Sequence, residues 1–189
     1  MDAGCAAGAW AACAARASSS PLVRSTPVRP LLLALPLAAC AGSPPPAAPA
    51  PAFDPIAFFS GRTTGRGELH VILRQPRPIT VQGAGRIRRD GALVLTQRVE
   101  VENRPARTRR WVIRRTGPGR YAGTLTDATG PVLGEARGNS LRLSYPSRDG
   151  RVEQWLTLSP DGRTARNRLT VRRLGVVVAR VEEVIRKQG

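Results

Sequence analysis

The sequence has few of the residues that most often build catalytic and metal-binding sites. Its 189 residues include three cysteines and one histidine, and Cys5, Cys13 and Cys40 all precede the last three quarters of the chain. Beyond Cys40 the chain therefore has no disulfide, no cysteine nucleophile and no thiolate metal site. A single histidine with scattered acidic residues also argues against a metal centre, and we expect no metal and no cofactor.

Catalytic motifs are equally scarce. The pattern G-x-S-x-G is absent, and the segment GAGRIR has Arg88 where a dinucleotide-binding loop needs its third glycine. His70 lies between apolar residues, which is more typical of a packed or surface imidazole than of a general base. Glu100 and Glu102 share one strand face and are the remaining candidates for carboxylate chemistry. We therefore predict that the protein is not an enzyme, with a carboxylate-based hydrolase as the third hypothesis.

A long apolar run is also missing. The run Leu31 to Ala39 has nine residues and is interrupted by Pro36. A membrane-spanning helix needs about 20 apolar residues, whereas the core of a signal peptide needs about 7 to 15. Arg24 and Arg29 precede the run, and Leu37-Ala38-Ala39-Cys40 ends it. This tetrapeptide resembles the bacterial lipobox, which implies cleavage between Ala39 and Cys40 and a lipid thioether on Cys40. The alternative is an ordinary secretory signal with a chance cysteine.

These features divide the chain into three parts. We predict a signal peptide over residues 1–39, in which residues 1–22 are a misannotated or disordered extension. Residues 40–52 are predicted to be the lipidated Cys40 and an Ala/Pro-rich tether, and residues 53–189 a single domain. Acyl chains on Cys40 would hold the protein on a membrane. Ala41 favours the outer membrane, so we expect a lipid-anchored protein of the bacterial cell envelope, on the periplasmic face.

Basic residues outnumber acidic residues by a wide margin. The sequence has 30 of the former and 13 of the latter, and Lys187 is its single lysine. The arginine bias is typical of a GC-rich genome, but the excess over acids favours anionic partners such as phosphates, carboxylates and lipid head groups. Nucleic acid is a poor partner for an exported protein, so we expect none.

The domain reads as a series of short strands after one short helix. Asp54 and Pro55 suit the start of a helix, and Gly61 suits its exit. Turn residues such as Asp90-Gly91 and Asp149-Gly150 then separate alternating apolar runs. We predict an all-β fold, an antiparallel up-and-down meander closing into a lipocalin-like barrel of about ten strands. An open sandwich, in which the strand glycines form bulges, is the alternative. The predicted strands span residues 67–74, 79–89, 92–102, 107–116, 120–127, 131–138, 140–145, 151–159, 163–173 and 176–187.

The domain resembles the bacterial lipoprotein family called domain of unknown function 3833. The resemblance runs from about Phe59 to Lys187 and rests on FFSGRTTGRGELH, on RRWVIRRTGPGRYAGTLTDATGPVLGEARGNSLRLSY and on EQWLTLSPDGRTARNRLTVRRLGVVVARVEEVIRK. It implies an envelope lipoprotein and no particular activity. The chain departs from the family at Glu153-Gln154, where members usually carry paired acids before the tryptophan that is Trp155 here.

Aromatic and arginine side chains suggest a ligand site. Arg107, Arg109 and Arg115 share a strand face with Trp111, and Tyr145 and Trp155 lie on later strands. If that face points inward, the barrel encloses a cationic and apolar cavity suited to an amphipathic or anionic lipid-like molecule. We therefore take Arg107, Arg109, Trp111, Tyr145 and Trp155 as candidate ligand-binding residues.

Two alternatives stay open at this point. The aromatic residues could be core filling, and the arginines could face outward. A packed barrel with a cationic outer surface would fit a structural or assembly lipoprotein that contacts an envelope partner. The sequence does not decide the oligomeric state.

Overall fold

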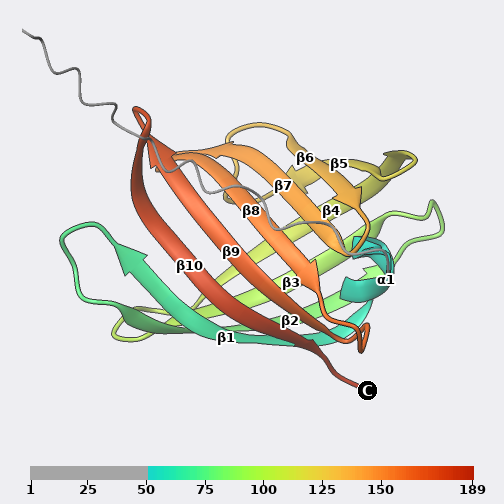
Figure 1. Cartoon of the computed structure of the whole chain (residues 1–189), viewed down its shortest axis with the longest axis horizontal. Helices are drawn as coiled ribbons and strands as arrows, with labels where there is room; N and C mark the ends of the chain where they lie inside the picture. The colour runs from blue at the N-terminus through green and yellow to red at the C-terminus, as the bar shows by residue number, and fades with distance from the viewer. Residues whose placement is uncertain (1–50) are drawn as a thin grey trace, which may run out of the picture. The chain divides into compact units, whose positions relative to one another are not determined.

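The structure, a computed structural model, describes residues 51–189. This part of the chain forms one short helix and ten strands (Figure 1). In chain order they are α1 (Pro55–Phe59), β1 (Gly61–Val71), β2 (Arg77–Ile87), β3 (Leu93–Val101), β4 (Arg107–Gly117), β5 (Arg120–Leu125), β6 (Val132–Arg137), β7 (Ser140–Ser147), β8 (Gly150–Leu158), β9 (Thr164–Arg173) and β10 (Val176–Lys187).

The strands form a closed antiparallel barrel. Each strand pairs with the next along the chain, and β1 also pairs with β10, from Thr63 opposite Lys187 to Val71 opposite Ala179. Tight turns make the up-and-down path feasible, as at Gly91, where φ is +75°. The predicted lipocalin-like barrel of about ten strands is thus confirmed, and the open sandwich is wrong.

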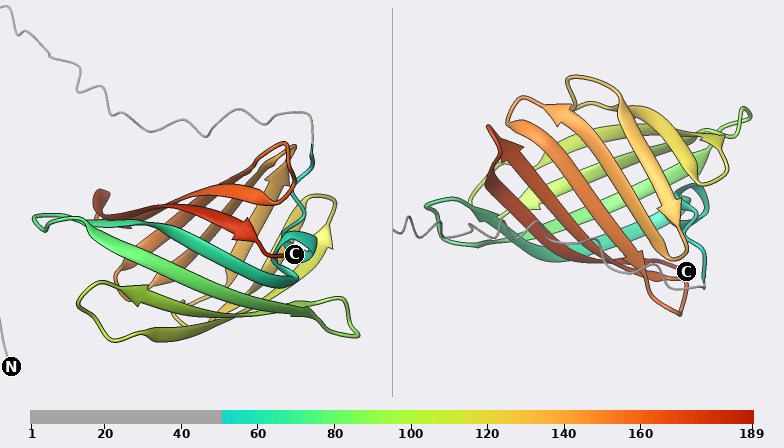
Figure 2. Two further views of the ribbon diagram at one scale, coloured as in Figure 1. Left: turned by 90° about the horizontal axis from the view of Figure 1, so that it is seen from below. Right: turned by 45° about the horizontal axis from the view of Figure 1, so that its top comes forward.

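The barrel has two different ends. One end, which we call the closed end, carries α1 and the connections 88–92, 118–119, 138–139 and 159–163. The other, the open end, carries the loops 72–76, 102–106, 126–131, 148–149 and 174–175. Figure 2 shows α1 tucked against the closed end, beside the C-terminus.

Helix α1 covers the closed end because its local sequence both starts a helix and supplies aromatic rings. Asp54 Oδ1 accepts a hydrogen bond from Ile56 N at 3.0 Å, and Pro55 occupies the first turn. Phe58 and Phe59 are buried, with their rings edge to face at 4.9 Å. The predicted helix and its cap are therefore confirmed. Within residues 51–189 no helix is long and apolar enough to cross a membrane.

Inward-facing apolar residues form two clusters rather than one core. The larger cluster fills the closed end and continues along β5 to β8, with Leu93, Leu141 and Leu156 fully buried. The second cluster lies nearer the open end and consists of Ile79, Val81, Val99 and Val181, with Leu69, Val101 and Leu169 packed against it. The interior between the two clusters contains polar side chains.

Candidate functional site

Five polar side chains cross the barrel interior, and we call them the interior polar belt: Gln97, Arg109, Gln154, Asn167 and Glu183. Strand alternation places them inside. On β3, Gln97 stands between Leu95 of the larger cluster and Val99 of the second, and on β10 Glu183 stands likewise between Ile185 and Val181. The belt therefore separates the two apolar clusters.

One half of the belt is a hydrogen-bonded group on β3 and β4. The Gln97 side-chain oxygen accepts from Arg109 Nε at 2.9 Å and from Trp111 Nε1 at 2.8 Å. The Arg109 guanidinium lies 5.7 Å from the centre of the Trp111 ring. Trp111 in turn meets Tyr145 of β7 edge to face at 5.6 Å. These contacts fix the arginine and both aromatic rings in one arrangement.

The other half of the belt joins β9 to β10. Asn167 and Glu183 are direct cross-strand partners, and Asn167 Nδ2 donates to Glu183 Oε2 at 3.2 Å. The carboxylate lies where β1 has no side chain, because a Cβ added to Gly65 would come within 2.0 Å of Glu183 Oε1. Burial raises the pKa of Glu183, and the opposing influences of Arg109 and of the Asn167 hydrogen bond are smaller.

Arg109 acts on both walls of the interior. Burial raises the pKa of Glu183 on β10 and of Tyr145 on β7, and the positive charge of Arg109 partly offsets the rise at both residues. Strands β7 and β10 are separated by β8 and β9 in the barrel. Arg109 is in the inward register of β4, so its charge is directed to the interior, where a bound anionic group would meet it.

Two buried acceptors in the belt have no partner within residues 51–189. Gln154 and Asn167 are 6% and 5% exposed, and the side-chain oxygen of each accepts no hydrogen bond from this part of the chain. A buried polar atom without a partner costs about 1 to 3 kcal/mol. Both residues occupy inward registers, so a molecule in the interior with hydrogen-bond donors would recover that free energy.

Solvent reaches the interior from the open end. Along the inward faces of β1 and β9, Leu69, Val71, Leu169 and Val171 keep partial exposure, whereas the apolar inward residues Leu93, Ile113 and Leu158 at the closed end are buried. Arg107 is exposed on the inward face at the start of β4. Between the mouth and the polar belt, the four core residues of the second cluster are buried, and Leu69 and Leu169, packed against them, are partly exposed.

The structure brings together most of the predicted ligand-binding residues but not all. Arg109, Trp111 and Tyr145 meet in the interior, and Arg107 lies above them at the mouth. Trp155 is misplaced in the prediction. Its neighbours Gln154 and Leu156 point inward, so Trp155 lies on the outer face, with the guanidinium of Arg142 5.5 Å from its ring centre. Trp155 therefore does not line the interior with the others.

Gln97, Gln154, Asn167 and Glu183 were not predicted as ligand-site residues. Gln154 was noted only as part of the departure from the family at Glu153-Gln154. A detectable signal was present, because each occupies the inward register of its strand, two positions from buried apolar residues on both sides. A polar residue at an inward position is uncommon in a packed barrel.

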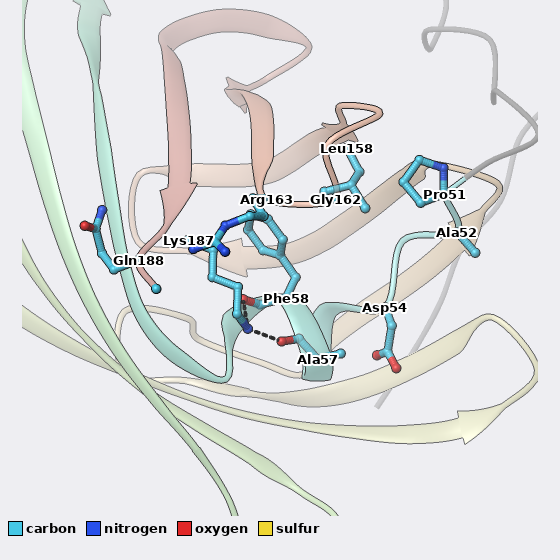
Figure 3. A pocket seen from close by; sticks show the side chains of 11 residues that line it. Pro51, Ala52, Asp54, Ala57, Phe58, Leu158, Gly162, Arg163, Lys187 and Gln188 are labelled. Atoms are coloured by element: carbon cyan, nitrogen blue, oxygen red, sulfur yellow. Dashed lines mark hydrogen bonds between the residues drawn. The ribbon is translucent and has the colours of Figure 1, made fainter.

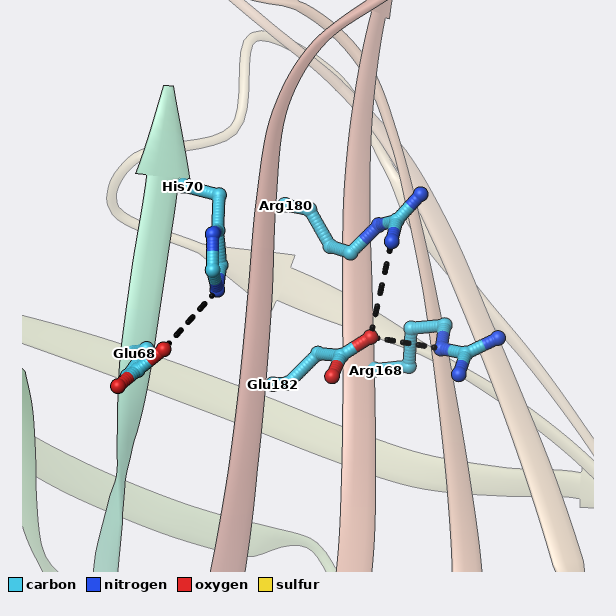
Figure 4. A network of polar contacts seen from close by, with 5 residues as sticks. All are labelled: Glu68, His70, Arg168, Arg180 and Glu182. Carbon is cyan, nitrogen blue, oxygen red and sulfur yellow. Dashed lines mark ion pairs between the residues drawn. The ribbon is translucent and has the colours of Figure 1, made fainter. Parts of the chain in front are cut away.

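The carboxylates on the outer face are engaged in ion pairs. Figure 4 shows Glu182 between Arg168 and Arg180, and Glu68 beside His70, whose Nε2 lies 3.3 Å from Glu68 Oε2. His70 is therefore a surface imidazole. Glu100 accepts from Arg98 at 2.7 Å.

Metal and paired-carboxylate sites find no support in this part of the chain. Among the described residues no three His, Cys, Asp or Glu side chains gather as metal ligands would. Glu183 is also the one acid there whose strand register directs it into the interior.

A recess of about 530 Å³ lies outside the barrel at the closed end (Figure 3). Pro51, Ala52, Leu158 and the C-terminal residues line it. The ammonium group of Lys187 in this recess already has hydrogen-bond partners. Its Nζ donates to the carbonyl oxygens of Ala57 at 2.6 Å, Phe58 at 3.2 Å and Ser60 at 2.7 Å. Lys187 therefore binds the end of α1 and is not available to a ligand in the recess, so the interior polar belt is the stronger candidate site.

Comparison with known proteins supports the fold and identifies the family. No curated protein sequence matched the chain. Among solved structures, an S-type phycobiliprotein lyase from Guillardia theta superposes with a TM-score of 0.55 over 71% of this chain and 90% of that chain. At 7% identity this likeness shows the fold alone. The family model described as "protein of unknown function (DUF3833)" matches residues 35–187, and the chain belongs to that family.

Proposed function

We propose that this protein is a lipid-anchored binding module of the bacterial cell envelope. Its barrel would hold one amphipathic molecule with an anionic polar group, without chemical conversion. The anchor would be the acylated Cys40, on the periplasmic face of the outer membrane, a part of the chain that lies outside the described residues. The membrane contact supplied by the acyl chains and the small molecule in the barrel are separate parts of this proposal.

The observation that carries the proposal is the interior polar belt with its two unpartnered acceptors. Arg109 offers a cation to a carboxylate or phosphate, and Gln154 and Asn167 offer acceptors to hydroxyl or amide groups on the same molecule. The second apolar cluster, between the belt and the mouth, suits a hydrocarbon tail. A fatty acid or a lysophospholipid carries this combination of groups.

The raised pKa of Glu183 fits the same ligand class. An ionised carboxylate beside the binding space would repel an anionic head group, whereas its protonated form donates a hydrogen bond. The likeness to a phycobiliprotein lyase fold is compatible with a small molecule in the barrel, since barrels of this size can enclose one.

Native mass spectrometry of the full chain, extracted from the envelope of a bacterial host in mild detergent, tests both parts. We expect an acyl mass on Cys40 and one retained small molecule per chain. Arg109→Gln should lower ligand occupancy about tenfold, because a charge-assisted hydrogen bond contributes about 1.5 to 3 kcal/mol. Arg110→Gln is the matched control, because Arg110 is the next residue on the same strand and is exposed on the outer face.

The outcomes separate the two parts of the proposal. Absence of acyl mass on Cys40 would contradict the anchor alone. A barrel that retains no molecule, or equal ligand loss in both arginine variants, would contradict the binding module. A result that contradicts the binding module would favour the structural or assembly role, in which the cationic surface contacts an envelope partner.

A further inference from the structure

Exposed apolar side chains gather at the open end of the barrel. Within residues 51–189, six large apolar residues are more than half exposed, and four of them, Ile72, Leu73, Leu174 and Val176, lie at this end. Leu73 and Leu174 are the extreme cases, with 98% and 97% of their surface exposed. Two fully solvated leucines at loop tips bury no apolar area and therefore do not stabilise the fold.

The two leucines lie on adjacent hairpins. Leu73 is in the β1–β2 loop and Leu174 in the β9–β10 turn, and β1 pairs with β10 in the closed barrel. The pairing continues into the loop, because Ile72 N donates to Val178 O at 3.0 Å. In the left view of Figure 2 both hairpins project from the same end of the barrel.

Their backbone conformation is unfavourable for leucine. Leu73 has φ of +59° and Leu174 has φ of +49°, a left-handed region that L-residues with larger side chains seldom adopt. Elsewhere in the described chain every positive φ belongs to glycine or to Asn103, at +57° in the β3–β4 loop. Strain of this kind is concentrated at functional sites, so the leucine side chains themselves are the feature to explain.

Arginines surround the same mouth. We call them the rim arginines: Arg74, Arg77, Arg104, Arg107, Arg148, Arg151, Arg172 and Arg173. Within the described residues none of them forms an ion pair with an acidic side chain. The open-end loops hold three acids, Glu102, Asp127 and Asp149. The rim therefore presents a net positive, unpaired charge around two exposed leucines.

We propose that the open rim docks on an anionic lipid bilayer. Leu73 and Leu174 insert among the acyl chains at the interface, and the rim arginines bind lipid phosphates. The barrel mouth then opens onto the membrane, so an amphipathic molecule can pass between bilayer and barrel without crossing water. This contact requires neither a lipid on Cys40 nor a ligand inside the barrel.

The proposed anchor and the rim contact are compatible in length. The described chain starts at the closed end, where Pro51 and Ala52 line the recess beside Leu158. A strand of 11 residues such as β1 is about 36 Å long, and a tilt of about 40° gives a barrel roughly 28 Å tall. Residues 41–52 can span at most about 40 Å. A chain anchored at Cys40 can thus reach along the barrel while the mouth faces the bilayer.

Vesicle co-sedimentation of the full chain carrying Cys40→Ser tests the rim without an acyl anchor. We expect binding to vesicles of phosphatidylglycerol and phosphatidylcholine, and little binding to phosphatidylcholine alone. Leu73→Asn with Leu174→Asn should weaken binding about tenfold per leucine. Arg74→Gln with Arg173→Gln should weaken it about fivefold per arginine.

Matched variants away from the rim serve as controls. Ile87→Thr with Leu133→Thr removes two other exposed apolar side chains, at the closed end and on the outer wall, and should leave binding unchanged. Arg89→Gln with Arg163→Gln removes two positive charges at the closed end and should also leave vesicle binding unchanged. Asparagine tolerates positive φ, so the leucine double variant should unfold at the same urea concentration as the parent or at a higher one.

Three results would overturn the proposal. The first is absence of binding to anionic vesicles. The second is binding that the rim variants and the control variants weaken equally, which would indicate adsorption through overall charge. The third is a leucine variant that changes self-association of the protein without vesicles and leaves vesicle binding intact, which would assign the rim to contacts between copies of the chain.

Discussion

Lys187 is the single lysine in a chain with 30 basic residues, and its ammonium group has a local function. It donates hydrogen bonds to three carbonyl oxygens, those of Ala57, Phe58 and Ser60, as Figure 3 shows for the first two. These carbonyls belong to the end of α1, whose last carbonyl groups have no partner within the helix. A compact ammonium group can satisfy three converging acceptors, whereas the planar guanidinium of arginine cannot.

Replacing this lysine should loosen the helix. Lys187→Met is expected to lower the free energy of unfolding by about 2 kcal/mol, because it leaves partly buried carbonyl groups without a donor. Arg186→Met, at the preceding exposed position, should change it by less than about 0.5 kcal/mol. Urea unfolding followed by circular dichroism measures both, and equal effects would show that Lys187 does not hold α1.

Glu183 should make stability depend on pH. Its folded pKa is raised, so the folded state binds the proton more tightly than the unfolded chain does. The resulting stabilisation is complete at pH values below the unfolded pKa and is lost as pH rises through the folded pKa. Glu183→Gln lacks this loss, so it should be more stable than the parent at pH 7 and lose that advantage in acid. Urea unfolding at several pH values measures the difference.

Asp161 provides a control of opposite sign. Hydrogen bonds from the Thr164 side chain and from two backbone amides lower its pKa, so its contribution is present at neutral pH and lost in acid. Asp161→Asn should therefore be less stable than the parent at pH 7 and approach it in acid. If both variants shifted in the same direction with pH, burial of Glu183 would not be the cause.

At the scale of elements, α1 and β2 are packed without space for a side chain between them. A Cβ added to Gly85 would lie 1.8 Å from Phe59 O, which is backbone and has little freedom to move. Gly85→Ala should therefore displace α1 and cost about 2 kcal/mol or more in unfolding free energy. Gly117→Ala in β4 is the matched control, because no atom lies within 4 Å of an added Cβ there. Equal urea midpoints for the two variants would contradict this packing.

Most elements could be predicted because their signals are local. Asp54 and Pro55 marked α1, and the turn residues marked nearly every strand end. The errors have physical reasons. The first strand was predicted to begin at Gly67 but begins at Gly61, because glycine and arginine hide the alternation of β1. Leu73 was assigned to the apolar face of that strand, but it lies in the loop with positive φ.

The candidate site was predictable only in part. Arg109 and Trp111 share a strand face, and that spacing is visible in the sequence. Which face points inward depends on register against other strands, so Trp155 was placed on the wrong side. The apolar residues two positions before and after Gln154 and Asn167 indicate an inward register, but whether that face is packed or forms a ligand site depends on the assembled barrel.

At the scale of the whole molecule, closure joins residues that are far apart in sequence. The pairing of β1 with β10 brings Thr63 opposite Lys187 and leaves no free edge among the ten strands. The sequence favoured a barrel over a sandwich, but strand tilt and stagger, which decide closure, are collective properties that no short segment encodes.

The same closure allows the chain to begin at a different strand without a change in the order of neighbours around the barrel. Pro51 and Gly189 line one recess, so a short peptide could join them, and a cut between Asp90 and Gly91 would create new ends at the same side of the barrel. Such a circular permutant would retain every strand pair while its synthesis began with β3. The permutant should therefore keep the thermodynamic stability of the parent. Its folding pathway should differ, because the strands would pair in a different order.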